Sequence, residues 1–252
     1  MDLSAVNFAD LVPFILVGFA AQLVDGALGM AFGVISSTLL ITLGINPAAA
    51  SASVHAVEVF TTGASGISHV LHKNVNWKLF RRIVIPGVIG GIIGAYGLTL
   101  AMDSARPFVL AYLVAIGLYL LWRGIRHGHQ ERKPRIVEPL GFIGGFLDAA
   151  GGGGWGPVVT SNLLVQGAHP RKVIGTVNTA EFFLSVTISA TFIASLGFEA
   201  FTMAMAGLLI GGLAAAPLGG YFAKRIPGRA LLIMVGTVLV VTSAYGIWKA
   251  LA

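Results

Sequence analysis

The chain has 252 residues, of which 56 % are hydrophobic and only 10 % are charged, and it contains no cysteine. Ordinary globular domains carry about 25 % charged residues, so this composition excludes a soluble enzyme, a disordered chain and a disulfide-stabilised scaffold. The net charge of +6 is typical of a membrane protein with basic residues on its cytoplasmic side, and we expect no nucleic-acid partner. These features predict an all-α polytopic membrane protein whose surroundings are the lipid bilayer.

The first apolar segment, residues 11–45, follows an N-terminus with two aspartates and no basic residue, so we expect no cleaved signal peptide. Glycines interrupt this segment between Asp25 and Gly33. We expect a broken or re-entrant hairpin of two half-helices that enters and leaves the membrane by the same face. Irregular backbone at membrane depth must be surrounded by protein or line a water-filled cavity, so the interruption is a candidate site.

Three long apolar stretches follow, at about residues 48–72, 83–102 and 105–122, and each contains at most one Asp, Glu, Lys or Arg. About 20 apolar residues cross the hydrocarbon core as a helix, so each stretch is predicted to be a transmembrane span. The basic segment 126–138 is then predicted to be a cytoplasmic linker.

The second half repeats this order, beginning with a hairpin at residues 140–166. Four consecutive glycines, Gly151 to Gly154, follow Asp148 in this segment. In a straight helix each of them would cost about 1 kcal/mol relative to alanine, which favours a second broken or re-entrant hairpin. Three more spans are predicted at about residues 173–198, 200–223 and 230–248.

An offset of 123 residues aligns the two halves without a gap and places identical residues at no fewer than ten of the 44 positions from Phe19 to Thr62. Chance would give about three or four, so we interpret residues 1–125 and 139–252 as two copies of one unit. Each unit is a broken or re-entrant helical hairpin plus three transmembrane helices. The matched residues include Asp25 and Asp148, Gly29 and Gly152, Gly33 and Gly156, Gly44 and Gly167, Pro47 and Pro170, and Glu58 and Glu181.

The basic residues give the predicted topology. If the N-terminus lies outside, 14 of the 16 Lys and Arg residues fall in inner segments, and only Arg106 and Lys249 fall outside. An odd number of crossings per unit inverts the second copy, so the charge distribution predicts an inverted repeat with the N-terminus outside. Inverted repeats with broken helices that meet at the midplane recur in secondary transporters.

Apart from Arg106 near the start of the third predicted span, the only Asp, Glu, Lys or Arg residues inside the apolar segments are four acidic ones. They form two repeat-related pairs: Asp25 and Glu58, Asp148 and Glu181. Charged groups at membrane depth usually line a pathway or pair with one another. His55 lies three residues before Glu58 and therefore shares its helix face. Two interpretations stay open for these five residues: they couple or gate transport by carrying protons, or they form a structural network in which the aspartates cap backbone amides.

The second half-helix of each hairpin is predicted to begin near Gly33 or Gly156 and to point its N-terminal amides at the centre. Free amides and a positive helix dipole would bind a small anion there without lysine or arginine. The alternative is that the glycines allow close helix packing. The candidate binding residues are Gly29, Gly33, Ser37, Ser53, Gly152, Gly153, Gly154, Trp155, Gly156, Thr160, Ser161, Thr176 and Asn178.

Metal and cofactor motifs are absent from the sequence. There is no H-E-x-x-H pattern, no cysteine and only one histidine near the acidic residues, so we expect no zinc site. The glycines from Gly151 to Gly154 are not followed by the Gly-Lys-Ser/Thr of a phosphate-binding loop, and we expect no cofactor.

The chain resembles the TauE/SafE family of sulfite and organosulfur anion exporters over nearly its whole length. The resemblance rests on the two glycine-rich segments, each followed by a G-x-x-P step: Gly44-Ile-Asn-Pro47 and Gly167-Ala-His-Pro170. It rests also on Gly66-Ile-Ser-His69, which runs into Asn74-Val-Asn-Trp77-Lys. The first hairpin has fewer glycines than is usual in the family, and the family's G-T step occurs only as Gly175-Thr176, so the half-sites are expected to contribute unequally.

The resemblance implies a secondary transporter of the bacterial inner membrane, not an enzyme, that exports a small sulfur-containing oxyanion by alternating access. We expect it to be a monomer or homodimer. Proton coupling through Glu58, Glu181 and His55 remains one interpretation of the polar faces. Two alternatives stay open: an anion channel, and a cation or metal carrier that uses the buried carboxylates as ligands.

Overall fold

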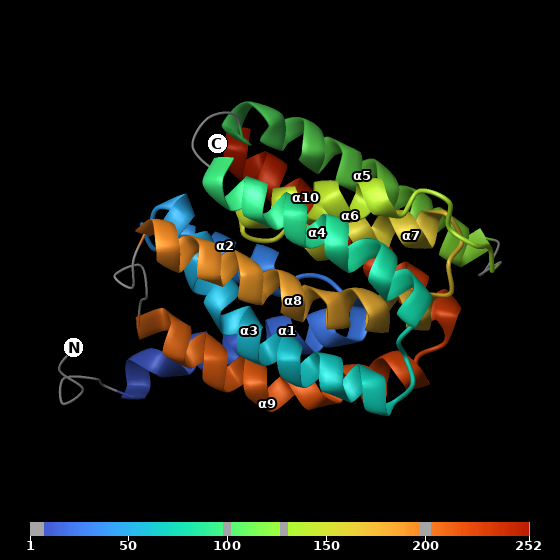
Figure 1. The fold of residues 1–252 in the computed structure, drawn as a ribbon, viewed down its shortest axis with the longest axis horizontal. Helices are drawn as coiled ribbons and strands as arrows, with labels where there is room; N and C mark the ends of the chain where they lie inside the picture. Colours follow the sequence, from blue (N-terminus) through green and yellow to red (C-terminus); the bar gives the residue numbers. More distant parts are fainter. Residues whose placement is uncertain (1–7, 98–101, 127–130, 197–202, 252) are drawn as a thin grey trace.

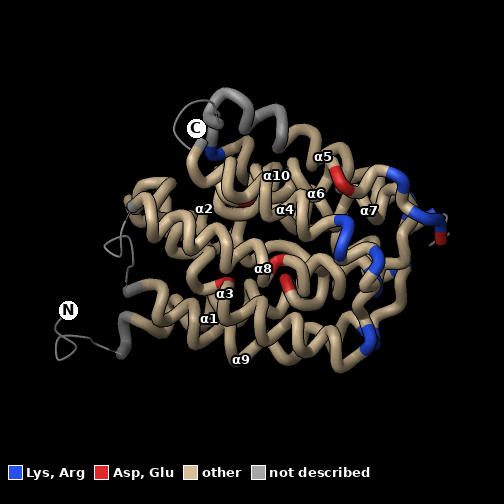
Figure 2. Tube along the Cα trace, in the orientation of Figure 1, with Lys and Arg blue, Asp and Glu red and all other residues tan. Residues whose placement is uncertain are grey.

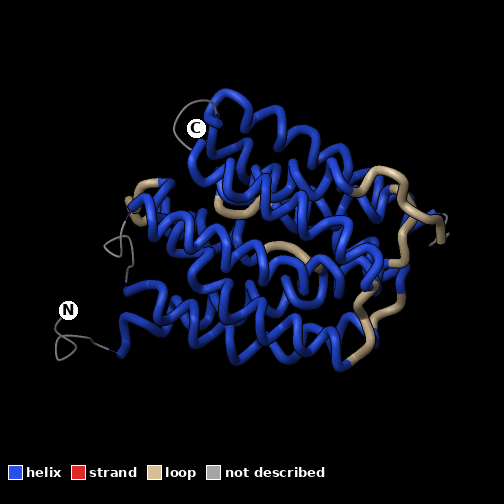
Figure 3. Tube along the Cα trace, viewed as in Figure 1, coloured by secondary structure: helices blue, strands red, loops and turns tan. Residues whose placement is uncertain are grey.

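The computed structural model describes residues 8–97, 102–126, 131–196 and 203–251. Within these ranges the chain is helical and contains no strand, which confirms the all-α prediction (Figure 3). The predicted span ends at 98–101 and 197–202, and residues 127–130 of the linker, lie outside the described residues. The helices are α1 (Phe8–Leu28), α2 (Phe32–Thr42), α3 (Pro47–Leu71), α4 (Trp77–Gly97), α5 (Met102–Arg126), α6 (Glu138–Gly151), a π-helical turn (Gly156–Thr160) continuous with α7 (Ser161–Val165), α8 (Pro170–Leu196), α9 (Met203–Arg225) and α10 (Gly228–Leu251).

Five of the described helices are long and apolar enough to cross a membrane: α1, α4, α8, α9 and α10. The last four fall on predicted spans. The prediction that α1 is a half-helix is wrong, because it has 21 residues and at 1.5 Å per residue is about 31 Å long. Helix α3 also has 25 residues but is not among the five, because it carries a row of buried serine, threonine, histidine and glutamate side chains.

The helices lie along one long axis and are joined mostly at the two ends of the molecule (Figure 1). Helix α1 packs on α9, α6 on α4, α5 on α10, and α3 on α8. Lysine and arginine residues gather at the end where α3 joins α4 and α9 joins α10 (Figure 2). The molecule therefore has one strongly basic end.

Two loop segments lie in the interior of the bundle rather than at its ends, where α1 turns into α2 and α6 turns into the π-helical turn (Figure 3). Helix α2 returns toward the end from which α1 came, and α7 returns toward the basic end from which α6 came (Figure 1). The two hairpins thus approach the centre from opposite ends.

Matched glycines give the hairpins their shape. Gly29 and Gly152, at the interior turns, have φ of 72° and 68°, and Gly44 and Gly167, after α2 and α7, have φ of 87° and 93°. Glycine populates this left-handed region without the steric cost that a Cβ imposes, which explains both turns and both helix ends. A proline follows each of the outer glycines by three residues and begins α3 or α8, where its missing N–H is not needed.

Candidate functional site

The two interior turns touch each other at the centre of the bundle. A Cβ on Gly33 would lie 2.8 Å from the Cα of Gly153 and 3.1 Å from Oε1 of Glu58, so the backbone of α2 lies directly against the second turn. Thr160 Oγ1 donates to the carbonyl oxygen of Gly29 over 2.8 Å and links the turns. At these positions the glycines serve close packing, one of the two interpretations that the sequence left open.

Each aspartate holds the amides at the start of the returning arm of its own hairpin. Asp148 Oδ1 accepts from the backbone N–H groups of Gly154, at 2.9 Å, and Trp155, at 3.0 Å. The Asp25 carboxyl accepts in the same way from the N–H of Phe32, which is the repeat position of Trp155. The prediction that these amides are free for a ligand is therefore wrong for the bonded ones, because the carboxylates already occupy the two helix N-termini.

Each aspartate also contacts a polar side chain of the other half. Asp148 Oδ2 lies 3.2 Å from Nε2 of His55 on α3, and Asp25 Oδ2 lies 3.2 Å from Nδ2 of Asn178 on α8. All four side chains are buried. His55 and Asn178 are themselves separated by the repeat offset, so the two contacts are equivalent in position but differ in chemistry.

The hydrogen bonds of His55 fix how many protons the His55–Asp148 contact holds. Nδ1 lies 2.8 Å from the carbonyl oxygen of Ser51, so Nδ1 carries a hydrogen and donates it. The Ser51 hydroxyl donates to the carbonyl of Ala149 over 2.8 Å and leaves only its acceptor lone pairs toward Nδ1. The contact between Nε2 and Asp148 Oδ2 then requires one proton between them, on the imidazole or on the carboxyl.

The two glutamates lie in different surroundings. Glu58 Oε2 lies 4.0 Å from His55 Nε2 and 3.5 Å from Oγ of Ser185. Glu181 is also buried, but its Oε2 and the neighbouring Oδ1 of Asn178 have no hydrogen-bond partner within the described part of the chain. The two glutamates thus differ in their contacts, and an unpaired buried carboxyl oxygen is costly unless a proton or a ligand satisfies it.

Ligand atoms of His55, Glu58 and Asp148 lie within 4.8 Å of one another, which is close enough for a metal ion. The sequence did not predict this set, because Asp148 is 93 residues from His55 and belongs to the other hairpin. One nitrogen and two carboxylates suit zinc or another divalent transition metal.

A cavity of about 150 Å³ opens beside the glycine-rich turn, between α2, α5 and α10. A buried water needs about 10–15 Å³, so the cavity has room for a small solute with some water. Its walls carry hydroxyl groups and glycine backbone but no Asp, Glu, Lys or Arg side chain. Three predicted binding residues line it: Ser37, Gly153 and Gly154.

Most other predicted binding residues are held in contacts within the protein. Trp155 Nε1 donates to the carbonyl of Val177 over 3.1 Å. Thr176 Oγ1 donates to the carbonyl of Lys172 over 2.6 Å and accepts from the N–H of Asn76 over 2.8 Å. Neither side chain lines the 150 Å³ cavity. The same is true of Gly29, Gly33, Ser53, Gly152, Gly156, Thr160, Ser161 and Asn178.

Four residues at these sites are not predicted from the sequence. Ser51 and Ser185 contact His55 and Glu58, and their one signal is spacing, since each lies four residues from a predicted site residue on the same helix face. Thr242 and Ser243 line the cavity from α10. No sequence signal distinguished this pair, because a lone hydroxyl in an apolar helix usually bonds its own backbone, as Thr242 does to Val238.

Comparison with known proteins gives consistent results. The family model described as "Sulfite exporter TauE/SafE" matches residues 14–246. The protein named "Probable membrane transporter protein YtnM" of Bacillus subtilis (strain 168) is 43 % identical over 246 residues, which cover 93 % of this chain and 81 % of that protein. "Probable membrane transporter protein YjnA" of the same organism is 26 % identical over 249 residues, covering 92 % of this chain and 97 % of that protein. No solved structure matches the chain significantly.

Proposed function

The chain belongs to the TauE/SafE sulfite exporter family, and from this membership we propose that it exports a small oxyanion of the sulfite or organosulfonate class by alternating access. It is a multi-pass membrane transporter and not an enzyme. The direction of transport, the substrate and the mechanism are the parts that we propose.

One observation supports the mechanism: the buried aspartates near the ends of α1 and α6 are each bonded to a side chain of the opposite half. Asp25 contacts Asn178, and Asp148 contacts His55. A movement of one half against the other has to break or rearrange these contacts, because each contact joins one hairpin to a long helix of the other half. The network is therefore placed where it can link transport to a change in protonation.

We further propose that the two halves are an inverted repeat with the N-terminus outside. Three observations support it. The left-handed glycines recur at the offset of 123 residues. Helix pairs recur likewise, since the pair α1 and α9 corresponds to the pair α6 and α4. The two hairpins come from opposite ends, and the basic end matches the cytoplasmic side expected from the positive-inside rule (Figure 2).

The 150 Å³ cavity is the proposed anion site. Ser37, Ser243 and Gly153 line it, and neutral hydroxyl and amide donors bind and release an anion without the strong retention of a buried lysine or arginine. Because Asp148 occupies the amides of Gly154 and Trp155, the anion binds beside the helix N-terminus rather than on it.

Proton coupling is assigned to the shared proton of His55 and Asp148 and to Glu58 beside them. When the proton leaves, the imidazole and carboxyl lose their bond across the halves, so the protonation state and the relative position of the halves depend on each other. Glu181, with an unpaired oxygen, is the equivalent group of the other half-site.

Flux into proteoliposomes with sulfite, thiosulfate, sulfoacetate and sulfate as competing solutes tests the proposal. Wild-type protein should accumulate one or more sulfur oxyanions when a pH gradient is imposed, and Glu58→Gln should abolish the gradient-driven part while exchange continues. If a pH gradient cannot make the anion accumulate, and the protein shows conductance in a planar bilayer, it is an anion channel. Full gradient-driven transport by both Glu58→Gln and Glu181→Gln would refute the coupling assignment.

A cation carrier is a second candidate because His55, Glu58 and Asp148 come within metal-binding distance of one another. Such a carrier would take up zinc or another divalent metal, and divalent ions rather than sulfite would compete for transport. Binding of zinc to the purified protein that His55→Gln removes, together with zinc uptake, would favour this candidate over anion export.

A further inference from the structure

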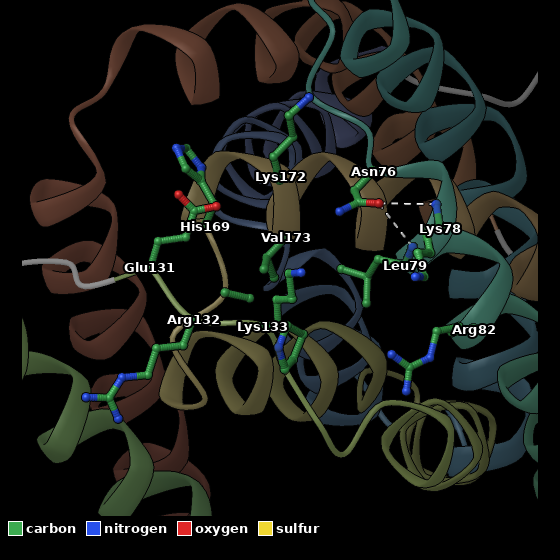
Figure 4. A pocket seen from close by; sticks show the side chains of 12 residues that line it. Asn76, Lys78, Leu79, Arg82, Glu131, Arg132, Lys133, His169, Lys172 and Val173 are labelled. Carbon is green, nitrogen blue, oxygen red and sulfur yellow. Dashed lines mark hydrogen bonds between the residues drawn. The ribbon is translucent and has the colours of Figure 1, made fainter.

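A second and larger cavity, of about 580 Å³, lies at the basic end of the molecule (Figure 4). Three separate segments form it: the start of α4, residues 131–134, and the connection from α7 into the start of α8. None of its lining residues lines the 150 Å³ cavity. The transport mechanism described above leaves this cavity without a role.

The lining of this cavity is strongly basic. Five of its residues are lysine or arginine and one is glutamate: Lys78, Arg82, Arg132, Lys133, Lys172 and Glu131. Figure 4 shows Lys133 extending toward Val173 at the centre of the cavity.

Arg82 is partly neutralised within this set. It donates from Nε and Nη2 to the carboxylate of Glu138, at 2.6 Å and 2.9 Å, and the pKa of Glu138 is lowered as a result. The remaining lysines and Arg132 still outnumber Glu131, so the cavity keeps a net positive charge. A concave basic surface concentrates anions in front of it.

Two helix N-termini add to this field. Helix α4 begins at the cavity, where Asn76 Oδ1 accepts from the N–H groups of Lys78 and Leu79 at 3.1 Å and 3.2 Å (Figure 4). Helix α8 also begins there, at Pro170. The N-terminus of each helix carries a partial positive charge, which adds to the positive charge of the lysines.

The buried part of the cavity lining is apolar. Leu79 and Val173 lie there with 7 % and 0 % of their surface exposed. One helical turn beyond Val173, α8 carries Thr176, which accepts from the N–H of Asn76. Farther along the same helix lie Asn178 and Glu181. Helix α8 therefore runs from the cavity to the buried polar residues inside the bundle.

We propose that this cavity is the cytoplasmic vestibule of the transporter, a site that binds the oxyanion before Leu79 and Val173 separate and admit it. The vestibule rests on the proposed function, because it assigns the transported anion as its ligand. The positive-inside rule alone explains why basic residues gather at this end of the molecule. It does not require them to line one cavity together with two helix starts.

The experiment measures sulfite transport in proteoliposomes with the cytoplasmic end or the opposite end facing the added anion. Lys133→Gln combined with Lys78→Gln should raise the apparent KM from the cytoplasmic end about tenfold and leave the maximal rate unchanged. Tenfold is the lower limit of the rate enhancement that a charged cleft gives by concentrating its ligand. KM from the opposite end should stay the same. Lys224→Gln is the matched control, since Lys224 is exposed in the last turn of α9 at the same end but does not line the cavity.

An equal rise in KM from both ends, or an equal rise in Lys224→Gln, would show a general surface potential and overturn the vestibule. Unchanged KM together with weaker binding to vesicles that contain phosphatidylglycerol would assign the cavity to a lipid head group and also overturn it. Calorimetric titration of the detergent-solubilised full chain with sulfite separates this proposal from the proposed function. Binding that the double variant weakens, without any transport by the wild type, would refute export and leave the anion site standing.

Discussion

Replacing Asp148 by alanine or asparagine tests whether this carboxyl holds the second hairpin together. Oδ1 accepts two backbone N–H groups, and Oδ2 is the partner of His55. Asp148→Ala removes the cap and leaves a buried imidazole without its partner, and removal of one member of a buried pair costs about 3–5 kcal/mol.

Asp148→Asn should cost far less. Asparagine keeps the acceptor for both amides and ranks with aspartate as a helix cap, and its Nδ2 can donate to an unprotonated His55 Nε2, so we expect a loss below about 1.5 kcal/mol. Denaturant unfolding of the purified protein in one detergent, followed by tryptophan fluorescence, measures both values. If asparagine destabilises as much as alanine, the capping argument is wrong. If alanine is neutral, the buried network contributes nothing to stability.

Two further predictions concern the interior turns and the basic end. In Gly153→Ala the new Cβ would overlap the backbone of the opposing turn, so we expect a loss of about 1–3 kcal/mol by the same unfolding measurement, whereas Gly151→Ala, with nothing within 4 Å, should be neutral. Equal effects would refute the close contact of the turns. Because Arg82 lowers the pKa of Glu138 from 4.5 to about 2, this ion pair stabilises the protein above pH 4.5 and its contribution is lost as the pH falls toward 2. Glu138→Gln should therefore reduce the acid sensitivity of the unfolding midpoint and change it little at pH 7, since the pair is exposed, and an unchanged acid profile would contradict this.

The sequence was sufficient to predict an all-helical chain and the four acidic residues inside the helical bundle. Long uncharged stretches can only be helical in lipid, and a carboxylate at that depth needs a partner, so Asp25, Glu58, Asp148 and Glu181 were identifiable without a structure. The identity of each partner was not, because the contact of Asp148 with His55 depends on how two hairpins far apart in sequence meet.

Two other features were beyond the sequence for definite physical reasons. The length of α1 was missed because an apolar composition does not show at which depth a helix ends; only the left-handed glycine at Gly29 marks the point. The basic cavity was missed because its lining depends on residues 131–134 folding against the starts of α4 and α8. In the sequence alone, these charges indicate only the topology.

The bonds between the halves also constrain how the protein is made. The ribosome synthesises His55 well before Asp148, so when the first half enters the membrane its imidazole lacks the Asp148 carboxyl, and Asp25 lacks Asn178. The bond between Asp148 and His55 and the bond between Asp25 and Asn178 can form only after the second hairpin has been made. The two halves of the chain therefore have to finish folding together, and a stop or deletion after the first half removes the partners on which its hairpin depends.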